Sequence, residues 1–214
     1  MKKTTKALAF IFWMALFLLI AVYSRLNQTQ WFYDNLTSLI IICLVFLAAK
    51  VLKMKLLELN LFGTGLLLHN CGTFGWYQLH YGILGYDSFV HLVNSAILAW
   101  IMFNLIIRKI KMTERKQSKR AFLNEHVLLF LLLTISVTSL IGTAIELVEF
   151  AGYSVLGSGE GLYFPGDGDA DIIGNLPTGY ADTMMDILTN ILGAVIGTLM
   201  YYNFRYKHKR WLKY

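Results

Sequence analysis

The chain has few charged residues, few prolines and few cysteines, and each shortage excludes some classes of protein or of site. Only 15% of its 214 residues are charged and 57% are hydrophobic, whereas a soluble domain carries about a quarter charged residues. Two prolines leave few points at which a helix must break. The two cysteines, Cys43 and Cys71, lie within apolar segments, where small buried side chains explain them better than a disulfide or a metal pair. This composition predicts an all-α, multi-pass membrane protein.

Six apolar stretches are long enough to cross about 30 Å of hydrocarbon as helices. We predict one integral membrane domain, residues 1–214, with spans near 7–24, 36–52, 56–76, 88–107, 123–150 and 182–204. The first stretch follows three lysines, as a secretory signal would. Its long apolar run and the absence of a small-x-small cleavage site favour an uncleaved anchor. Residues 151–181 form the one long connection, a loop rich in glycine and in acidic side chains whose role the sequence leaves open.

Basic residues are nearly absent from every second connection between these stretches. If six helices alternate in direction, all of the 19 Lys and Arg residues except Arg25 lie on one side. The positive-inside rule then predicts that both termini are cytoplasmic, with the chain in the plasma membrane. Despite the formal net charge of +6, the basic run RKIKMTERKQSKR, residues 108–120, indicates contact with anionic lipid headgroups rather than with nucleic acid.

Acidic and imidazole side chains recur on one face of four predicted helices, at 100° per residue. The third stretch has His69, and the fourth has Asp87 and His91. The fifth has Glu146 and Glu149, and the sixth has Asp182, Asp186 and the amide Asn190. Because successive helices run in opposite directions, all four groups reach the same depth, near the outer surface. Charged side chains at such a depth face the bundle interior or a wet cavity rather than lipid. We therefore predict one shared site that opens to the outside.

No Lys or Arg lies in the outer half of any predicted span to balance these carboxylates. Several carboxylates cannot stay ionised together in a low-dielectric pocket. Either a cation fills the site, or some carboxyls are protonated and hydrogen-bonded, or the pocket is a water-filled vestibule. We predict a divalent metal ion, with the ligands Asp87, His91, Glu146, Glu149 and Asp186. Mixed imidazole and carboxylate donors suit zinc, manganese or ferrous iron, and carboxylates alone suit magnesium or calcium.

Three motifs resemble those of the YjdF-type family of bacterial inner-membrane proteins. They are YDSFVH at 86–91, ELVE at 146–149 and GYADTMMDILTNILGA at 179–194. The likeness covers roughly residues 60–200, and it departs from the family at Ser88, where lysine is frequent. A fainter likeness links Asp87, His91, Asp186 and Asn190 to VanZ-type membrane proteins associated with glycopeptide resistance. The resemblance implies the fold and the site but supplies no reaction.

Three classes of function stay open on the sequence. The first is a metal-dependent hydrolase or transferase acting on a lipid-linked or envelope substrate, with His69 or Asp182 as acid–base group and Asn190 orienting a ligand. The second is a proton- or metal-coupled transporter, although the polar stripes turn apolar deeper in the membrane and leave Glu58 as the one acid near the inner end. The third is a binding or assembly protein whose polar cluster only specifies helix packing.

Overall fold

The computed structural model describes residues 3–81, 84–109, 125–165 and 178–207. Its long helices are α1 (Lys3–Leu26), α2 (Trp31–Ala48), α3 (Leu56–Asn70), α4 (Tyr86–Lys109), α6 (Val127–Leu156) and α7 (Thr178–Tyr201). Short helical turns follow at η1 (Cys71–Phe74), η2 (Trp76–Gln78) and η4 (Tyr202–Lys207). The strands β1 (His80–Tyr81) and β2 (Leu84–Gly85) form only a two-residue antiparallel pair. The predicted all-helical class is therefore confirmed for the described residues.

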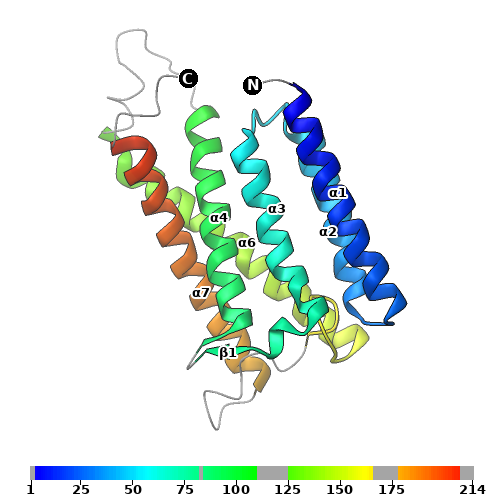
Figure 1. The fold of residues 1–214 in the computed structure, drawn as a ribbon. Helices are drawn as coiled ribbons and strands as arrows, with labels where there is room; N and C mark the ends of the chain where they lie inside the picture. Colours follow the sequence, from blue (N-terminus) through cyan, green and yellow to red (C-terminus); the bar gives the residue numbers. More distant parts are fainter. Residues whose placement is uncertain (1–2, 82–83, 110–124, 166–177, 208–214) are drawn as a thin grey trace.

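The long helices lie side by side, and α1 begins at the same end of the bundle at which α7 ends (Figure 1). The closest pair is α4 and α7. Gly193 and Gly197 of α7 lie directly against the carbonyl oxygens of Leu92 and Ala96, and neither site has room for a Cβ. Small residues allow this approach of two backbones within a membrane. The contact fixes α7 against the helix that carries His91.

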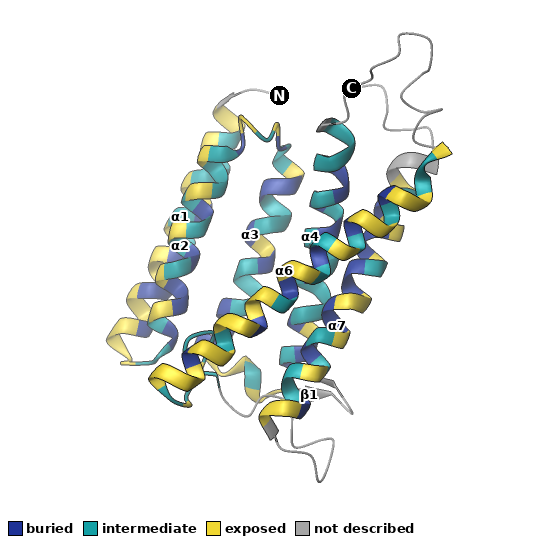
Figure 2. Cartoon of the chain, turned by 180° about the vertical axis from the view of Figure 1, so that it is seen from behind, coloured by how far each residue is buried: buried dark blue, intermediate teal, exposed yellow. Residues whose placement is uncertain are grey.

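Helix α6 buries polar residues and exposes apolar ones, as a membrane helix does. Thr134, Thr138 and Glu146 are buried at four- and eight-residue intervals, whereas Leu132 and Leu140 are exposed. Figure 2 shows the exposed stripe along α6, on the side turned away from α4 and α7. An intramembrane helix places its polar side chains where other protein groups can satisfy them.

Five of the helices are long and apolar enough to cross a membrane, judged by length and composition. They are Thr4–Leu26, Trp31–Ala48, Tyr86–Arg108, Val127–Leu156 and Gly179–Phe204. The remaining long helix, α3, has 15 residues, which is short for a span of about 30 Å. It nevertheless runs beside its neighbours within the bundle (Figure 1). The count of six spans and the side of each terminus thus stay predictions.

Several predicted boundaries are wrong. Helix α2 begins at Trp31 rather than near residue 36 and ends at Ala48. Helix α3 does not continue to residue 76, because the chain turns through η1 to Gly75, which has a φ of 77°.

The predicted loop at 151–181 is also too long. Helix α6 runs on to Leu156, where Gly157 with a φ of 91° ends it. Helix α7 begins at Thr178, before the predicted start near residue 182. Residues 166–177, which hold three of the four acidic residues of the predicted loop, lie outside the described residues. The described part of the loop, residues 157–165, folds back onto α2.

A buried ion pair joins α3 to α4 at the end of the bundle where α3 begins. Nη2 and Nη1 of Arg108 lie 2.5 and 3.0 Å from the two carboxylate oxygens of Glu58, whose side chain is 1% exposed. Asn104 also donates to Glu58 and accepts a 2.8 Å hydrogen bond from the hydroxyl of Tyr201. Glu58, the one acid that suggested a path across the membrane, is therefore held by a structural network.

Candidate metal centre

The first turn of α4 brings a carboxylate and an imidazole onto the same face. Asp87 lies at the N-terminus of this helix, where a negative side chain is favoured by the helix dipole. His91 follows four residues later, the spacing at which two helical side chains meet. Its Nε2 lies 3.3 Å from Oδ1 of Asp87.

The neighbouring helix α7 adds a second carboxylate at the same ring nitrogen. Oδ1 of Asp186 lies 3.8 Å from Nε2 of His91, and the Asp186 side chain is 2% exposed. One donor atom from each of Asp87, His91 and Asp186 lies within 4.8 Å of the other two. We call these three residues the Asp–His–Asp group.

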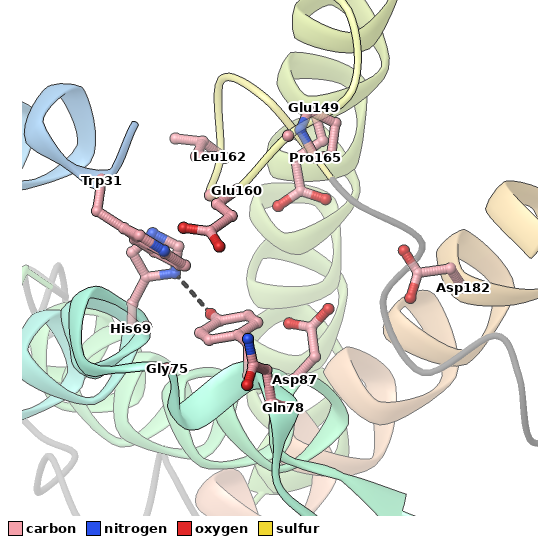
Figure 3. Close-up of a pocket in the computed structure, with 14 residues that line it drawn as sticks. Trp31, His69, Gly75, Gln78, Asp87, Glu149, Glu160, Leu162, Pro165 and Asp182 are labelled. Atoms are coloured by element: carbon pink, nitrogen blue, oxygen red, sulfur yellow. Dashed lines mark hydrogen bonds between the residues drawn. The ribbon is translucent and has the colours of Figure 1, made fainter. Parts of the chain in front are cut away.

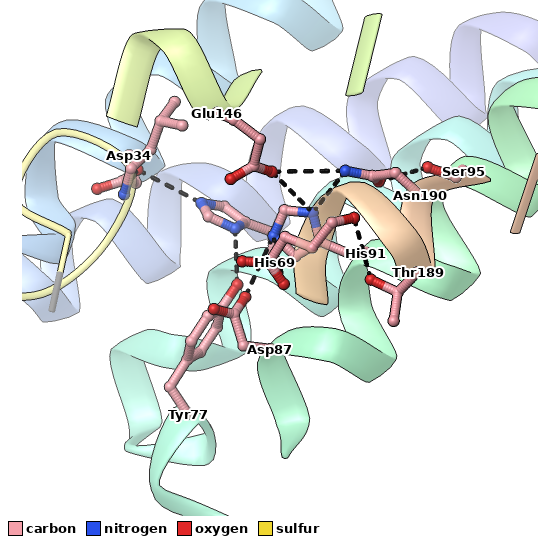
Figure 4. A network of polar contacts seen from close by, with 11 residues as sticks. Asp34, His69, Tyr77, Asp87, His91, Ser95, Glu146, Thr189 and Asn190 are labelled. Carbon is pink, nitrogen blue, oxygen red and sulfur yellow. Dashed lines mark hydrogen bonds and ion pairs between the residues drawn. The ribbon is translucent and has the colours of Figure 1, made fainter. Parts of the chain in front are cut away.

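The opposite nitrogen of the same ring faces α6 and a different set of partners (Figure 4). Nδ1 of His91 lies 3.5 Å from Oε1 of Glu146 and 3.1 Å from the amide nitrogen of Asn190. The Asn190 amide nitrogen also donates to Glu146 at 3.4 Å. Ser95 donates to the Asn190 oxygen at 2.6 Å, which orients the amide with its nitrogen toward His91. The His91 ring is thus fixed from both edges.

The Asp–His–Asp group fits a divalent cation by its geometry and by its donors. At a metal–ligand distance of about 2.1 Å, two ligands of a tetrahedral ion are about 3.4 Å apart. The two carboxylate oxygens lie 3.3 and 3.8 Å from Nε2 of His91, and all three donor atoms lie within 4.8 Å of one another. Oδ2 of Asp186 is buried without a hydrogen-bond partner, a costly arrangement for a carboxylate unless a nearby cation or a proton on the carboxyl neutralises it. One imidazole and two carboxylates suit zinc, manganese or ferrous iron.

Glu146 supports this fit in the tautomer of His91 that carries its proton on Nδ1. In that tautomer the Nδ1–H and the Asn190 amide nitrogen both donate to Glu146, and the 3.1 Å contact between these two nitrogens is not a hydrogen bond. A metal-bound histidine usually donates its second N–H to a carboxylate, which fixes the ring tautomer and its orientation. Glu146 has this position at Nδ1 of His91, opposite the edge that faces Asp87 and Asp186. It therefore orients the histidine instead of completing the Asp–His–Asp group.

A cavity of about 150 Å³ lies beside the Asp–His–Asp group, and we call it the polar cavity. Its acidic lining residues are Asp87, Glu149, Glu160 and Asp182. Figure 3 shows Asp87, Glu149 and Glu160 turned toward one space, with Asp182 opposite them on α7. None of the residues lining the polar cavity in the described part of the chain is Lys or Arg. The cavity therefore attracts cations.

Tyr77 and His69 form the side of the polar cavity that faces α2 and α3. The hydroxyl of Tyr77 lies 2.9 Å from Nδ1 of His69. Burial, and then the negative charges of Asp87 and Glu149, raise the pKa of Tyr77 well above its ordinary value. Tyr77 thus keeps its proton near neutral pH.

A second cavity, of about 210 Å³, lies deeper between α2, α3, α4, α6 and α7, and we call it the central cavity. Apolar side chains such as Ile41, Leu66 and Leu98 make up much of its lining. His69, Glu149 and Leu162 line both cavities and so lie between them. A ligand with a polar head and a short apolar part matches this pair of cavities.

The predicted residues divide into three sets. Asp87, His91 and Asp186 form the Asp–His–Asp group. Glu146 and Asn190 contact the other nitrogen of His91. The other predicted residues, Glu149, His69 and Asp182, line the polar cavity outside that group.

Sequence reasoning missed Asp34, which contacts Nε2 of His69 at 3.4 Å from the first turn of α2. Two sequence features could have identified it. It is the first acidic residue of the chain, and it lies within the aromatic run WFYD at 31–34. Because we predicted that the second span begins near residue 36, Asp34 lay outside it and was not considered.

A family model described as a predicted membrane protein (DUF2238) matches residues 6–207. The match covers nearly the whole chain and confirms the predicted YjdF-type resemblance. Neither the curated proteins nor the solved structures contain a match to this chain. The likeness to VanZ-type proteins stays a resemblance of motifs.

Proposed function

We propose that this chain, which belongs to the DUF2238 family of predicted membrane proteins, is a metal-dependent hydrolase or transferase. The observation that carries the proposal is the Asp–His–Asp group, in which two helices place three donor atoms within 4.8 Å of one another. Three protein ligands leave a coordination position open, which is the arrangement of catalytic rather than structural metal sites.

The residues around the group have separable roles. Asp87, His91 and Asp186 would hold the ion, while Glu146 keeps the His91 ring in the orientation that presents Nε2. A bound divalent ion lowers the pKa of a coordinated water and polarises a carbonyl or phosphoryl oxygen. Asp182 lines the polar cavity at a position from which it can exchange protons with a substrate, whereas His69, whose two ring nitrogens contact Asp34 and Tyr77, can do so only through Tyr77.

The charge of the polar cavity limits how a substrate can bind. Its described lining has four carboxylates and no Lys or Arg, so an anionic headgroup finds its counter-charge only in the metal ion. The apolar lining of the central cavity suits a short hydrocarbon part. We therefore extend the proposal to a lipid-linked or envelope substrate, reached from the outer face of the plasma membrane by a protein with both termini in the cytoplasm.

A coupled transporter has less support. Transport needs polar groups along the whole path, and Glu58 at the far end of α3 is engaged by Arg108 and Asn104. The apolar cluster of Phe103, Phe130 and Tyr201 fills the region near Asn104. A purely structural cluster is disfavoured by the unpartnered Oδ2 of Asp186.

Metal binding is tested by equilibrium dialysis of the purified, chelator-treated protein against zinc and manganese. We expect a single tightly bound ion per chain in the wild type and its loss in His91→Ala. His126→Ala is the matched control, because His126 lies just before α6 at the other end of that helix from Glu149. A wild type without metal, or equal metal in all three proteins, would rule out the site.

Catalysis is tested separately with the metal-loaded protein in vesicles of bacterial lipid extract, analysed by mass spectrometry. We expect new products with the wild type and none with His91→Ala. Unchanged lipids in both samples would contradict the lipid-linked substrate while leaving metal binding intact.

A further inference from the structure

A second histidine faces the polar cavity from α3, and each of its ring nitrogens has a partner. Nε2 of His69 lies 3.4 Å from Oδ1 of Asp34, and Nδ1 lies 2.9 Å from the hydroxyl of Tyr77. Figure 4 shows the three side chains in a row that ends with Tyr77 beside Asp87. The row thus runs from the buried start of α2 to the Asp–His–Asp group.

The hydrogen bonds assign a direction to this row. Oδ1 of Asp34 already accepts a 3.0 Å hydrogen bond from the backbone N–H of Leu162, so it acts as an acceptor toward His69 as well. The His69 proton therefore lies on Nε2, and Nδ1 is free to accept the hydroxyl hydrogen of Tyr77. This is the order of groups by which a carboxylate and a histidine activate a hydroxyl.

The surroundings hold the row in place. The Trp31 ring packs edge-on against His69 at a centroid distance of 5.4 Å, and it packs at a tilt against Tyr77 at 5.1 Å. The loop at 157–165 closes over Asp34 at Gly161, which has a φ of 93° and no room for a Cβ beside that carboxylate. Asp34 is 2% exposed and His69 is partly exposed to the cavity. Such packing fixes the distances that proton transfer requires.

We propose that Tyr77, His69 and Asp34 form a proton relay for the reaction at the Asp–His–Asp group. This inference rests on the proposed function. As a water in the polar cavity attacks the substrate, its O–H bond breaks and the proton passes to the Tyr77 oxygen. The Tyr77 proton passes to Nδ1 of His69 in the same step, and Asp34 stabilises the resulting imidazolium. The reverse transfer delivers one proton to the leaving oxygen, which restores all three groups.

The relay divides the roles among its members. Tyr77 is the catalytic residue, because its hydroxyl exchanges protons with the reacting molecules. His69 and Asp34 are positioning residues that act through Tyr77.

The test is nitrogen-15 NMR of histidine-labelled, metal-loaded protein in detergent, with His69→Gln used to assign the signal among the five histidines. In the wild type we expect a neutral His69 ring protonated on Nε2. Asp34→Asn should move the proton to Nδ1, since the amide can donate to Nε2, and Asp34→Glu should restore the wild-type pattern. Tyr77→Phe should shift the Nδ1 resonance and leave Nε2 protonated.

An unchanged His69 spectrum in Asp34→Asn and Tyr77→Phe would overturn the relay, as would a wild-type ring protonated on Nδ1 alone. Metal uptake, measured on the same samples, separates this failure from that of the proposed function. All these variants should bind metal as the wild type does, because none of them removes a member of the Asp–His–Asp group. A variant that folds but loses the metal would also overturn the relay, because its residue would then belong to the metal site.

Discussion

Nδ1 of His91 lies 3.5 Å from Oε1 of Glu146, on the opposite edge of the imidazole from Asp87 and Asp186. Glu146 and Asp186 therefore contact opposite nitrogens of the His91 ring. Asp186 lies with Asp87 at the Nε2 edge of the ring, whereas Glu146 lies at the Nδ1 edge.

Replacing Glu146 should weaken metal binding without abolishing it. Loss of a carboxylate that orients a metal-bound histidine typically costs about 10–100-fold in affinity, and we expect this range for Glu146→Gln. Titration calorimetry against Glu125→Gln, an exposed acid near the start of α6, measures it. Complete loss of metal would make Glu146 a direct ligand, and unchanged affinity would remove its role.

Gly142 makes space for the amide that contacts His91. A Cβ at this position would lie 2.8 Å from Cγ and 2.9 Å from the amide nitrogen of Asn190, so Gly142→Ala should displace Asn190 and reduce metal affinity. Gly179→Ala is the control, because a Cβ there has no atom within 4 Å. Equal metal affinity in both variants would show that the contacts of Asn190 do not govern the site.

The contact of α4 with α7 should depend on the absence of side chains at two positions. In Gly193→Ala and Gly197→Ala the new methyl group meets the backbone oxygens of Leu92 and Ala96, which cannot move aside easily. Overpacking of this kind costs about 1–3 kcal/mol. Thermal unfolding in detergent should therefore show lower midpoints for both variants and no change for Gly179→Ala. A stable Gly193→Ala protein would contradict the close packing of these helices.

The pair formed by Glu58 and Arg108 should contribute to stability and not to metal binding. Removing Arg108, which is 18% exposed, leaves the charge of the buried Glu58 uncompensated. In a fully buried pair this costs about 3–5 kcal/mol, so Arg108→Met should unfold at lower temperature. The double variant Glu58→Gln/Arg108→Met should recover part of the loss, as a coupled pair does. Reduced metal uptake in a folded Arg108→Met protein would instead connect this pair to the site.

The sequence predicted most of the site because it depends on helical spacing. Asp87 and His91 are four residues apart, and Asp186 and Asn190 repeat that interval on α7. Such spacing determines which side chains share a face before any contact between helices is known. We predicted that these polar faces lie at the same depth because we assumed that successive spans run in opposite directions.

The rest of the candidate site depends on distances between helices, which the spacing of residues along one helix does not determine. The sequence predicted Glu146 and Asp186 as ligands of the same ion, whereas the structure places them at different edges of the His91 ring. Asp34 was missed since its role arises from the loop at 157–165 folding back to donate from Leu162. The spacing of residues did not identify Tyr77 either, because the turn after α3 brings it to His69.

If Asp87, His91 and Asp186 hold one divalent ion, anomalous diffraction from crystals grown with zinc or manganese will locate it between them. We predict a single anomalous peak within bonding distance of Nε2 of His91 and of one carboxylate oxygen from each aspartate. A peak held only by Glu149, Glu160 or Asp182 in the polar cavity, or no peak in that region, would contradict the account.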